Sequence, residues 1–210
     1  MSDISRSLPD ETSLNSAAGV TIFDSQGQGV EFGSLLRKQP AIVVFIRHFF
    51  CGVGAMTLQQ YVTQLSSTRE DALLKANRQI IIVGCGSYEP IVTYKEITSC
   101  PFPIYADPKR ELYHALGMTT ETLTRTPANE KRRSYLRQGI LGNILGSIWS
   151  GPLKNPSLIG KQGNISQLGG EFVFNSGKSN LTCIFAHRMK HTEDHLEVPE
   201  LLQVAGVEYP

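Results

Sequence analysis

The chain has 210 residues, with 20 lysine and arginine residues against 19 aspartate and glutamate residues, and its formal net charge is +1. This balance gives nucleic acid and anionic membranes no electrostatic reason to bind, so we expect neither as a partner. No apolar run reaches the roughly 18 residues of a membrane span, and the first residues lack the charged and apolar parts of a signal peptide. Because four cysteines are also too few for a secreted disulfide framework, we expect a cytoplasmic protein.

The beginning of the chain is polar. Residues 1–18 show no clean periodicity and predict a flexible N-terminal arm, and residues 19–210 have the length of one domain. Within that domain, Val20–Phe23 and Val30–Phe32 flank a turn and predict a hairpin. A short helix through Leu35–Arg37 should follow.

The central feature is a buried strand that breaks into a short loop with one cysteine and restarts as a helix. Ala41–Ile46 is a run of six apolar residues, which is typical of a strand covered on both faces. Cys51 follows in the loop, and Met56–Leu65 has apolar residues at helical spacing. The next apolar run, Gln79–Gly86, predicts a second strand parallel to the first.

The position of Cys51 just before a predicted helix favours a role as a nucleophile. Free amides at the start of a helix favour a thiolate over a thiol, and the thiolate is the nucleophilic form. The alternative for Cys51 is a small buried hydrophobic residue, and we favour the nucleophile. Arg47 and His48 precede it: either side chain would lower the thiol pKa, or His48 would donate a proton. Alternatively, Arg47 faces solvent and His48 packs or caps.

The middle of the chain predicts a helix over residues 87–99 and then a strand over 100–107, whose prolines confine it to an edge or a strand start. Asp107 can cap a helix that begins at Pro108. Residues 119–163 predict a mostly helical insertion, in which residues 140–149 form an amphipathic stretch. This stretch either covers the sheet or lids a pocket, or is simply a packed surface helix.

Two strands near the end of the chain, at residues 169–174 and 181–186, predict an antiparallel hairpin, and a helix near residues 198–205 closes the chain. A parallel crossover followed by a hairpin and a closing helix is the plan of the thioredoxin fold. The expected fold class is therefore α/β, a thioredoxin-like three-layer sandwich with a central mixed sheet and a helical insertion.

Six segments in the same order resemble the peroxiredoxin-like 2 branch of the AhpC/TSA antioxidant family. They are Phe45–Gly52, Ile82–Ser87, Pro101–Pro108, Leu112–Met118, Gln167–Phe174 and Ala186–Met189. The resemblance implies a thioredoxin-fold reductase that uses a cysteine, here Cys51, to reduce hydroperoxides and in some members a lipid endoperoxide. Its reducing equivalents would come from a dithiol donor.

One departure from the family pattern concerns this cysteine. Relatives usually carry Cys-x-x-Cys at the junction, whereas Gly54 stands three residues after Cys51 here, and the segment is about four residues longer than usual. The Pro-x-x-x-Thr-x-x-Cys signature of ordinary peroxiredoxins is also absent. A second thiol is needed to clear the sulfenic acid that peroxide leaves on cysteine, and Cys85 is the candidate within the chain.

Two functions remain open. The first is a thiol-dependent oxidoreductase that acts through Cys51 alone or with Cys85, needs no cofactor and draws electrons from glutathione or a thioredoxin-like donor protein. The alternative is a redox-inactive member that binds or transforms an apolar small metabolite, as an isomerase or cyclase would, using Arg47, His48 or nearby tyrosines. A homodimer is compatible with either function.

Three histidines, His187, His191 and His195, recur at intervals of four residues, which would align metal ligands on a helix. The first ends a predicted strand and the residues around the others read as a polar turn. We therefore expect a solvated loop and no metal site.

Overall fold

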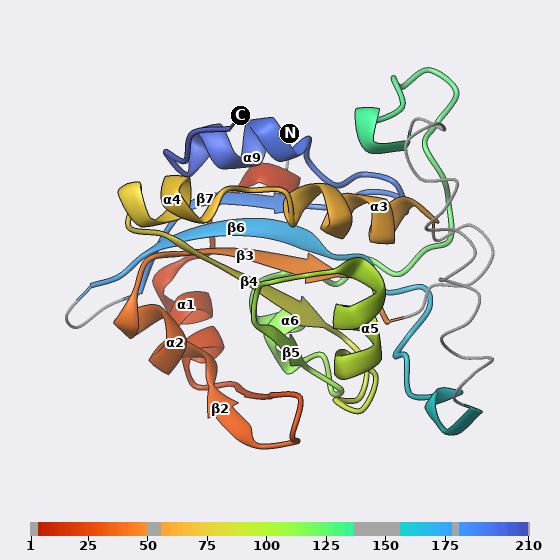
Figure 1. The fold of residues 1–210 in the computed structure, drawn as a ribbon, viewed down its shortest axis with the longest axis horizontal. Helices are drawn as coiled ribbons and strands as arrows, with labels where there is room; N and C mark the ends of the chain where they lie inside the picture. Colours follow the sequence, from red (N-terminus) through yellow and green to blue (C-terminus); the bar gives the residue numbers. More distant parts are fainter. Residues whose placement is uncertain (1–3, 50–55, 137–155, 178–180, 210) are drawn as a thin grey trace.

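A computed structural model of the chain describes residues 4–49, 56–136, 156–177 and 181–209 (Figure 1). At its centre is a seven-stranded mixed sheet with the order β2-β1-β5-β4-β3-β6-β7. The strands are β1 (Thr21–Phe23), β2 (Gly29–Glu31), β3 (Ala41–Ile46), β4 (Gln79–Gly84), β5 (Ile104–Ala106), β6 (Gly170–Asn175) and β7 (Thr182–Arg188). The helices are α1 (Glu11–Ala18), α2 (Phe32–Lys38), α3 (Met56–Leu65), α4 (Glu70–Lys75), α5 (Ile91–Thr98), α6 (Glu111–Ala115) and α9 (Val198–Val204).

The central strand β3 separates two hydrophobic cores. All six of its residues are buried, and successive side chains point to opposite faces of the sheet. Ile42, Val44 and Ile46 pack with residues of α3, α4, α5 and α9, whereas the other three pack with α1, α2 and α6. Figure 1 shows α3, α4 and α9 along one side of the sheet and α1 and α2 along the other. These three layers confirm the predicted fold class.

The predicted parallel crossover is confirmed. β3 and β4 pair in parallel from Ala41 opposite Gln79 to Ile46 opposite Gly84, so both strands end at the same edge of the sheet. β6 runs antiparallel on the other side of β3, with Gly170 opposite Phe45. The start of β6 therefore lies at this same edge.

Strand β5 occupies an inner position, between β1 and β4. Pro101 and Pro103 come before its first residue, Ile104, so they mark a strand start and not an edge strand. The predicted cap at Asp107 is present, because its carboxylate accepts hydrogen bonds from three successive backbone amides at residues 111–113. The helix itself begins at Glu111, three residues later than predicted.

The N-terminal region differs from the predicted arm. Residues 11–18 form helix α1, and the carboxylate of Asp10 caps it by accepting a hydrogen bond from the amide of Ser13. Leu14 and Ala17 are buried in the core beneath β3. Two apolar residues three positions apart are too few to produce a clear helical periodicity, although they are enough to attach one turn of helix to the core.

The predicted insertion at residues 119–163 is described at 119–136 and 156–163. These parts contain two 3-10 helices, η2 (Ser134–Leu136) and η3 (Pro156–Leu158), and an isolated bridge from Glu121 to Gln167. The amphipathic stretch at residues 140–149 lies outside the described residues. Among the residues that are described, no helix has the length and apolar character needed to cross a bilayer.

Candidate active site

The carboxyl edge of β3 and β4 brings together three of the predicted site residues. β3 ends at Ile46 and is followed by Arg47 and His48, and β4 ends at Gly84 and is followed by Cys85. Because the two strands end in register, Cys85 lies next to the start of the β3–α3 loop. Residues 50–55 of that loop, which include Cys51 and Gly54, lie outside the described residues.

The Arg47 side chain is turned into the protein. It is buried, and its Nη2 donates a hydrogen bond of 2.7 Å to the carbonyl oxygen of Ile165. The alternative in which Arg47 faces solvent is therefore wrong. Water screens the charge of a buried guanidinium only weakly.

His48 is also buried, and burial lowers its pKa to about 4. The ring is consequently neutral at pH 7. Its Nδ1 lies 3.1 Å from the carbonyl oxygen of Phe49, and a carbonyl can only accept, so Nδ1 carries the proton and Nε2 carries the lone pair. His48 can therefore act at Nε2 as a hydrogen-bond acceptor or base, but it cannot stabilise a thiolate through positive charge.

Cys85 is 2% exposed, and its thiol acts as a hydrogen-bond donor to the loop. Sγ lies 2.7 Å from the carbonyl oxygen of Arg47 and 3.7 Å from that of Asn164. Beside it, the hydroxyl of Tyr113 lies within hydrogen-bond distance of the carbonyl oxygens of Ile46 and Val83. Cys85 and Tyr113 both belong to the core that contains α1, α2 and α6. Their hydrogen bonds therefore hold the end of β3 in place.

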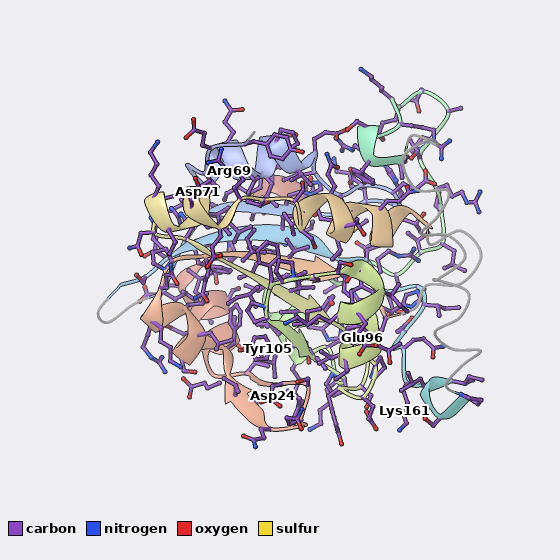
Figure 2. All side chains as sticks on the ribbon, viewed as in Figure 1. Asp24, Arg69, Asp71, Glu96, Tyr105 and Lys161 are labelled. Atoms are coloured by element: carbon purple, nitrogen blue, oxygen red, sulfur yellow. The ribbon has the colours of Figure 1, made fainter. Side chains whose placement is uncertain are left out.

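Residues 161–165 form a segment that crosses the same edge and binds both strand-end loops. The amide of Phe49 donates to the carbonyl of Gln162, and the amide of Ser87 donates to the carbonyl of Lys161, each at 2.9 Å. The Lys161 ammonium, labelled in Figure 2, lies 2.8 Å from the Glu89 carboxylate. Sequence reasoning missed this contact, because it assigned the segment to the end of the insertion.

Two glycines allow this close approach. A Cβ at Gly86 would lie 2.5 Å from the carbonyl oxygen of Gln162. Gly163 has φ +99° and a Cβ there would lie 2.7 Å from the backbone nitrogen of Gly86. The Gly-Cys-Gly sequence at residues 84–86 was therefore a readable indication that another backbone packs against the end of β4.

A cluster of buried charged side chains lies close to this edge, on β6, on β7 and in the loop after β7. It was not predicted from the sequence. Glu171 on β6 is fully buried, with His187 Nδ1 2.7 Å from one carboxylate oxygen and His195 Nδ1 hydrogen-bonded to the other. Burial alone would raise the pKa of Glu171, but the two histidines outweigh it and hold that pKa at about 2. Burial likewise disfavours the charged form of His187, yet Asp194 and Glu171 together raise its pKa to about 9.

The expected solvated loop is therefore wrong. His187, His191 and His195 are all buried, at 3%, 4% and 1% exposure, and the buried Glu171 carboxylate binds two of them, His187 and His195. The His195 ring stacks on the Tyr61 ring of α3, with centroids 4.4 Å apart and planes 13° apart. The cluster thus connects the sheet to the helix that follows the cysteine loop.

A cavity of about 280 Å³ lies elsewhere, between the turn after β1 and helix α5. Its lining includes Asp24, Glu96 and Tyr105, which Figure 2 labels, together with Ile91 and Ile104. Burial and the nearby Asp24 carboxylate raise the pKa of Tyr105. The cavity is not lined by Arg47, His48 or Cys85, so it is separate from the strand-end site.

The fold and the strand-end site define a thioredoxin-like protein of the peroxiredoxin type. The structure of peroxiredoxin Q from Xanthomonas campestris matches it with a TM-score of 0.54, covering 95% of this chain and 92% of that chain at 13% sequence identity. At this identity the match establishes the fold alone.

Sequence comparison identifies the family. A family model described as AhpC/TSA antioxidant enzyme matches residues 64–191, more than half of the chain but beginning after Cys51. Peroxiredoxin-like 2C of Homo sapiens is 32% identical over 91% of this chain and 80% of its own length. Prostamide/prostaglandin F synthase of Salmo salar is 30% identical over 58% of this chain and 62% of its own length. The chain belongs to the AhpC/TSA antioxidant family, and the resemblance to its peroxiredoxin-like 2 branch is confirmed.

Proposed function

We propose that the protein is a thiol-dependent oxidoreductase that reduces a hydroperoxide or endoperoxide through Cys51. The observation that carries the proposal is the place of this cysteine in a chain of the AhpC/TSA family. In the sequence, Cys51 falls between the end of β3 and the start of α3, a few residues after the buried Arg47 and His48. The peroxiredoxin fold supports a redox role, and the single-cysteine mechanism is our proposal.

The proposed reaction transfers two electrons from sulfur to a peroxide. The Cys51 thiolate attacks one oxygen of a hydroperoxide, an S–O bond forms as the O–O bond breaks, and the leaving oxygen takes a proton and departs as an alcohol. One donor thiol then condenses with the sulfenic acid to form a disulfide and water, and a second releases the Cys51 thiolate. With an endoperoxide, the attacked oxygen keeps its bond to carbon and forms a sulfenate ester with Cys51, while the other oxygen takes a proton and becomes an alcohol. A donor thiol then displaces the ester oxygen from sulfur as a second alcohol and forms a disulfide, which a second donor thiol cleaves to release the Cys51 thiolate.

Arg47 and His48 have different proposed roles. The buried Arg47 guanidinium would favour the thiolate through its charge. His48 is neutral at pH 7, because burial lowers its pKa to about 4, so its proposed role is to accept a hydrogen bond at Nε2. Cys85 remains the candidate resolving thiol, and its exchange with Cys51 would require it to leave the carbonyl of Arg47.

The proposed reaction needs an external electron donor and a peroxide substrate. Glutathione or a thioredoxin-like protein would supply the electrons, because Gly54 provides no second thiol at the junction. The Salmo salar relative is named for a prostaglandin-related synthase, which supports an apolar endoperoxide as one substrate class. We further propose a cytoplasmic location, no cofactor and a homodimer as the assembly.

Replacing Cys51 with serine tests the function directly. We expect Cys51→Ser to abolish thiol-dependent consumption of a hydroperoxide, measured as peroxide loss with glutathione or thioredoxin present. Cys183→Ser is the matched control and should retain activity, because Cys183 lies on β7 opposite Phe174, away from the site edge. Full activity in Cys51→Ser would exclude the proposal.

The second candidate is a redox-inactive protein that binds or transforms an apolar metabolite. Gly54, in place of the usual second cysteine, is the observation that favours it. Labelling of Cys51 by peroxide or by a thiol-reactive probe at neutral pH distinguishes the two functions. A reactive thiol supports the oxidoreductase, and an inert one supports the alternative.

A further inference from the structure

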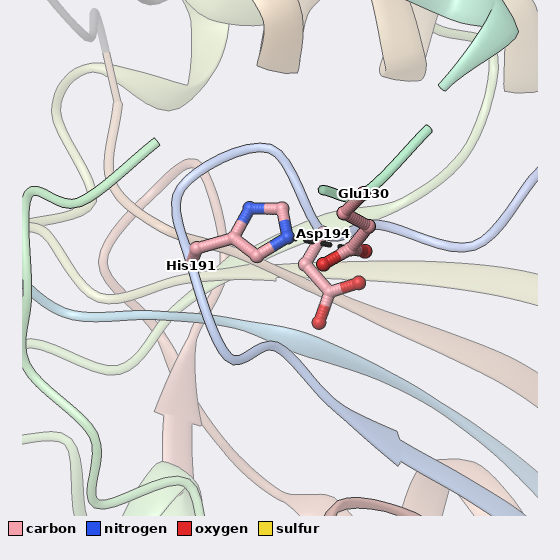
Figure 3. A group of neighbouring side chains, drawn as sticks. All are labelled: Glu130, His191 and Asp194. Atoms are coloured by element: carbon pink, nitrogen blue, oxygen red, sulfur yellow. Dashed lines mark ion pairs between the residues drawn. The ribbon is translucent and has the colours of Figure 1, made fainter. Parts of the chain in front are cut away.

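Three potential metal ligands meet where the loop after β7 contacts the segment before η2 (Figure 3). One ligand atom each from Glu130, His191 and Asp194 lies within 4.8 Å of the other two. Ligand atoms at about 2.0–2.2 Å from a tetrahedral zinc ion lie about 3.3–3.6 Å apart, so binding would draw these three side chains together by up to about 1.5 Å. We propose that these side chains form a binding site for a divalent transition-metal ion of the Zn²⁺ class, which is independent of the proposed peroxide chemistry.

The strongest indication is the imidazole of His191. The side chain is buried, and within the described part of the chain its Nε2 has no hydrogen-bond partner. Figure 3 shows this nitrogen turned toward Glu130, whose Oε1 lies 3.4 Å away, too far for a good hydrogen bond. A buried polar atom left in this way is costly, and a metal ion between imidazole and carboxylate would satisfy it.

The donor set and its surroundings fit such an ion. One imidazole nitrogen and two carboxylate oxygens are ligands that zinc accepts, and three protein ligands leave a fourth position for water. The side chain of Glu130 is 42% exposed, which provides a path from solvent. The carboxylate of Asp194 is held in position by its other oxygen. Oδ2 accepts a hydrogen bond from the amide of Lys190 and lies 3.6 Å from His187 Nε2.

Arg133 is the competitor for this site. Its Nη2 lies 2.7 Å from Asp194 Oδ1 and 4.0 Å from Glu130 Oε1, so the guanidinium now neutralises both carboxylates. Metal binding must share Asp194 with Arg133 or displace it. Binding also moves the ring proton of His191 from Nε2 to Nδ1, which loses the 3.3 Å contact from the Glu193 amide. Both effects weaken binding, and removing Arg133 should strengthen it.

The test uses full-length Cys51→Ser protein, so that this thiol cannot bind the metal. Zn²⁺ is titrated by calorimetry, and Co²⁺ by absorption, where thiolate ligands would appear as a charge-transfer band. We expect one saturable equivalent without that band, weakened at least about tenfold by Glu130→Gln or His191→Ala. Arg133→Gln should tighten it, and His114→Ala, which removes an exposed histidine on α6, should leave it unchanged.

Glu130→Gln keeps the test decisive if the buried His191→Ala variant fails to fold, since Glu130 is at the surface. The proposal is overturned if neither the parent nor Arg133→Gln shows saturable binding. It is equally overturned if Glu130→Gln binds as tightly as the parent. Arg133 would then be the cation that neutralises Glu130 and Asp194.

Discussion

Cys85 shows how one side chain serves the structure while remaining a candidate for chemistry. Its thiol donates to the carbonyl of Arg47, and Tyr113 binds the neighbouring carbonyl of Ile46. Both donors come from the core on one side of the sheet and hold the start of the loop that carries His48. The sequence placed Cys85 at the correct edge, but only the packing shows which atom its thiol contacts.

Substitutions at Cys85 separate the two roles. Cys85→Ala leaves the buried carbonyl of Arg47 without this donor, so we expect a loss of about 1–3 kcal/mol in the free energy of unfolding, measured with urea. Cys85→Ser retains a donor and should lose less. If Cys85 resolves the sulfenic acid, both variants lose turnover with peroxide equally; full turnover in Cys85→Ser would restrict Cys85 to its structural role.

At the scale of elements, the site depends on a segment that has no regular secondary structure. Residues 161–165 contact the loops after β3 and β4 through backbone hydrogen bonds, and two glycines permit the approach. Helix α1 is a similar case at the other end of the chain, because two buried residues attach it to the core. Both elements owe their position to distant partners.

Gly86→Ala tests the packing of the 161–165 segment. The new Cβ would lie 2.5 Å from a backbone oxygen, which cannot move without shifting the segment, so we expect a loss of about 1–3 kcal/mol of stability. Gly19→Ala is the control, because a Cβ there meets nothing closer than 3.8 Å, and its effect should stay within about 0.5 kcal/mol. Equal effects in urea unfolding would contradict the close approach.

Leu14→Ala tests whether α1 belongs to the core. Truncation of a buried leucine leaves a cavity, and we expect a loss of about 2–4 kcal/mol in the free energy of unfolding. The exposed neighbour Asn15, changed to alanine, should have little effect or a small stabilising one, because alanine is the better helix former. A flexible arm would make the two variants indistinguishable.

At the scale of the whole molecule, the buried charge cluster connects parts of the chain that are far apart in sequence. Glu171 on β6 binds His187 on β7 and His195 in the following loop, and His195 stacks on Tyr61 of α3. Such a cluster makes the stability of the fold depend on pH, because each buried ion relies on its partner.

The pH dependence has a definite sign. The pKa of His187 is raised from 6.5 to about 9, so its contribution is fully present below pH 6.5 and is lost as the pH rises through about 9. The shift corresponds to roughly 3 kcal/mol. We expect urea unfolding at pH 6.5 to 9.5 to show this loss in the wild type and in the surface control His114→Gln. His187→Gln should be less stable at pH 6.5 and lose less over the interval; a parallel decline would refute this role.

The sequence by itself determined the central strands, their parallel crossover and the family. Runs such as Ala41–Ile46 report burial on both faces directly, because every residue must be apolar. The same runs placed Arg47, His48 and Cys85 at one edge of the sheet. Local pattern is sufficient here, since the strand, its end and the next strand are close in sequence.

Only the tertiary structure decided the burial of the histidines, the contacts of residues 161–165 and the helix at residues 11–18. A polar turn such as residues 190–195 is predicted to be solvated unless its counter-ion is known, and the counter-ion of His195, Glu171, lies on strand β6. The 161–165 segment likewise takes its position from carbonyls and amides that no side-chain pattern records. In each case, contacts with residues distant in sequence stabilise the observed conformation. Local periodicity carries no information about those residues.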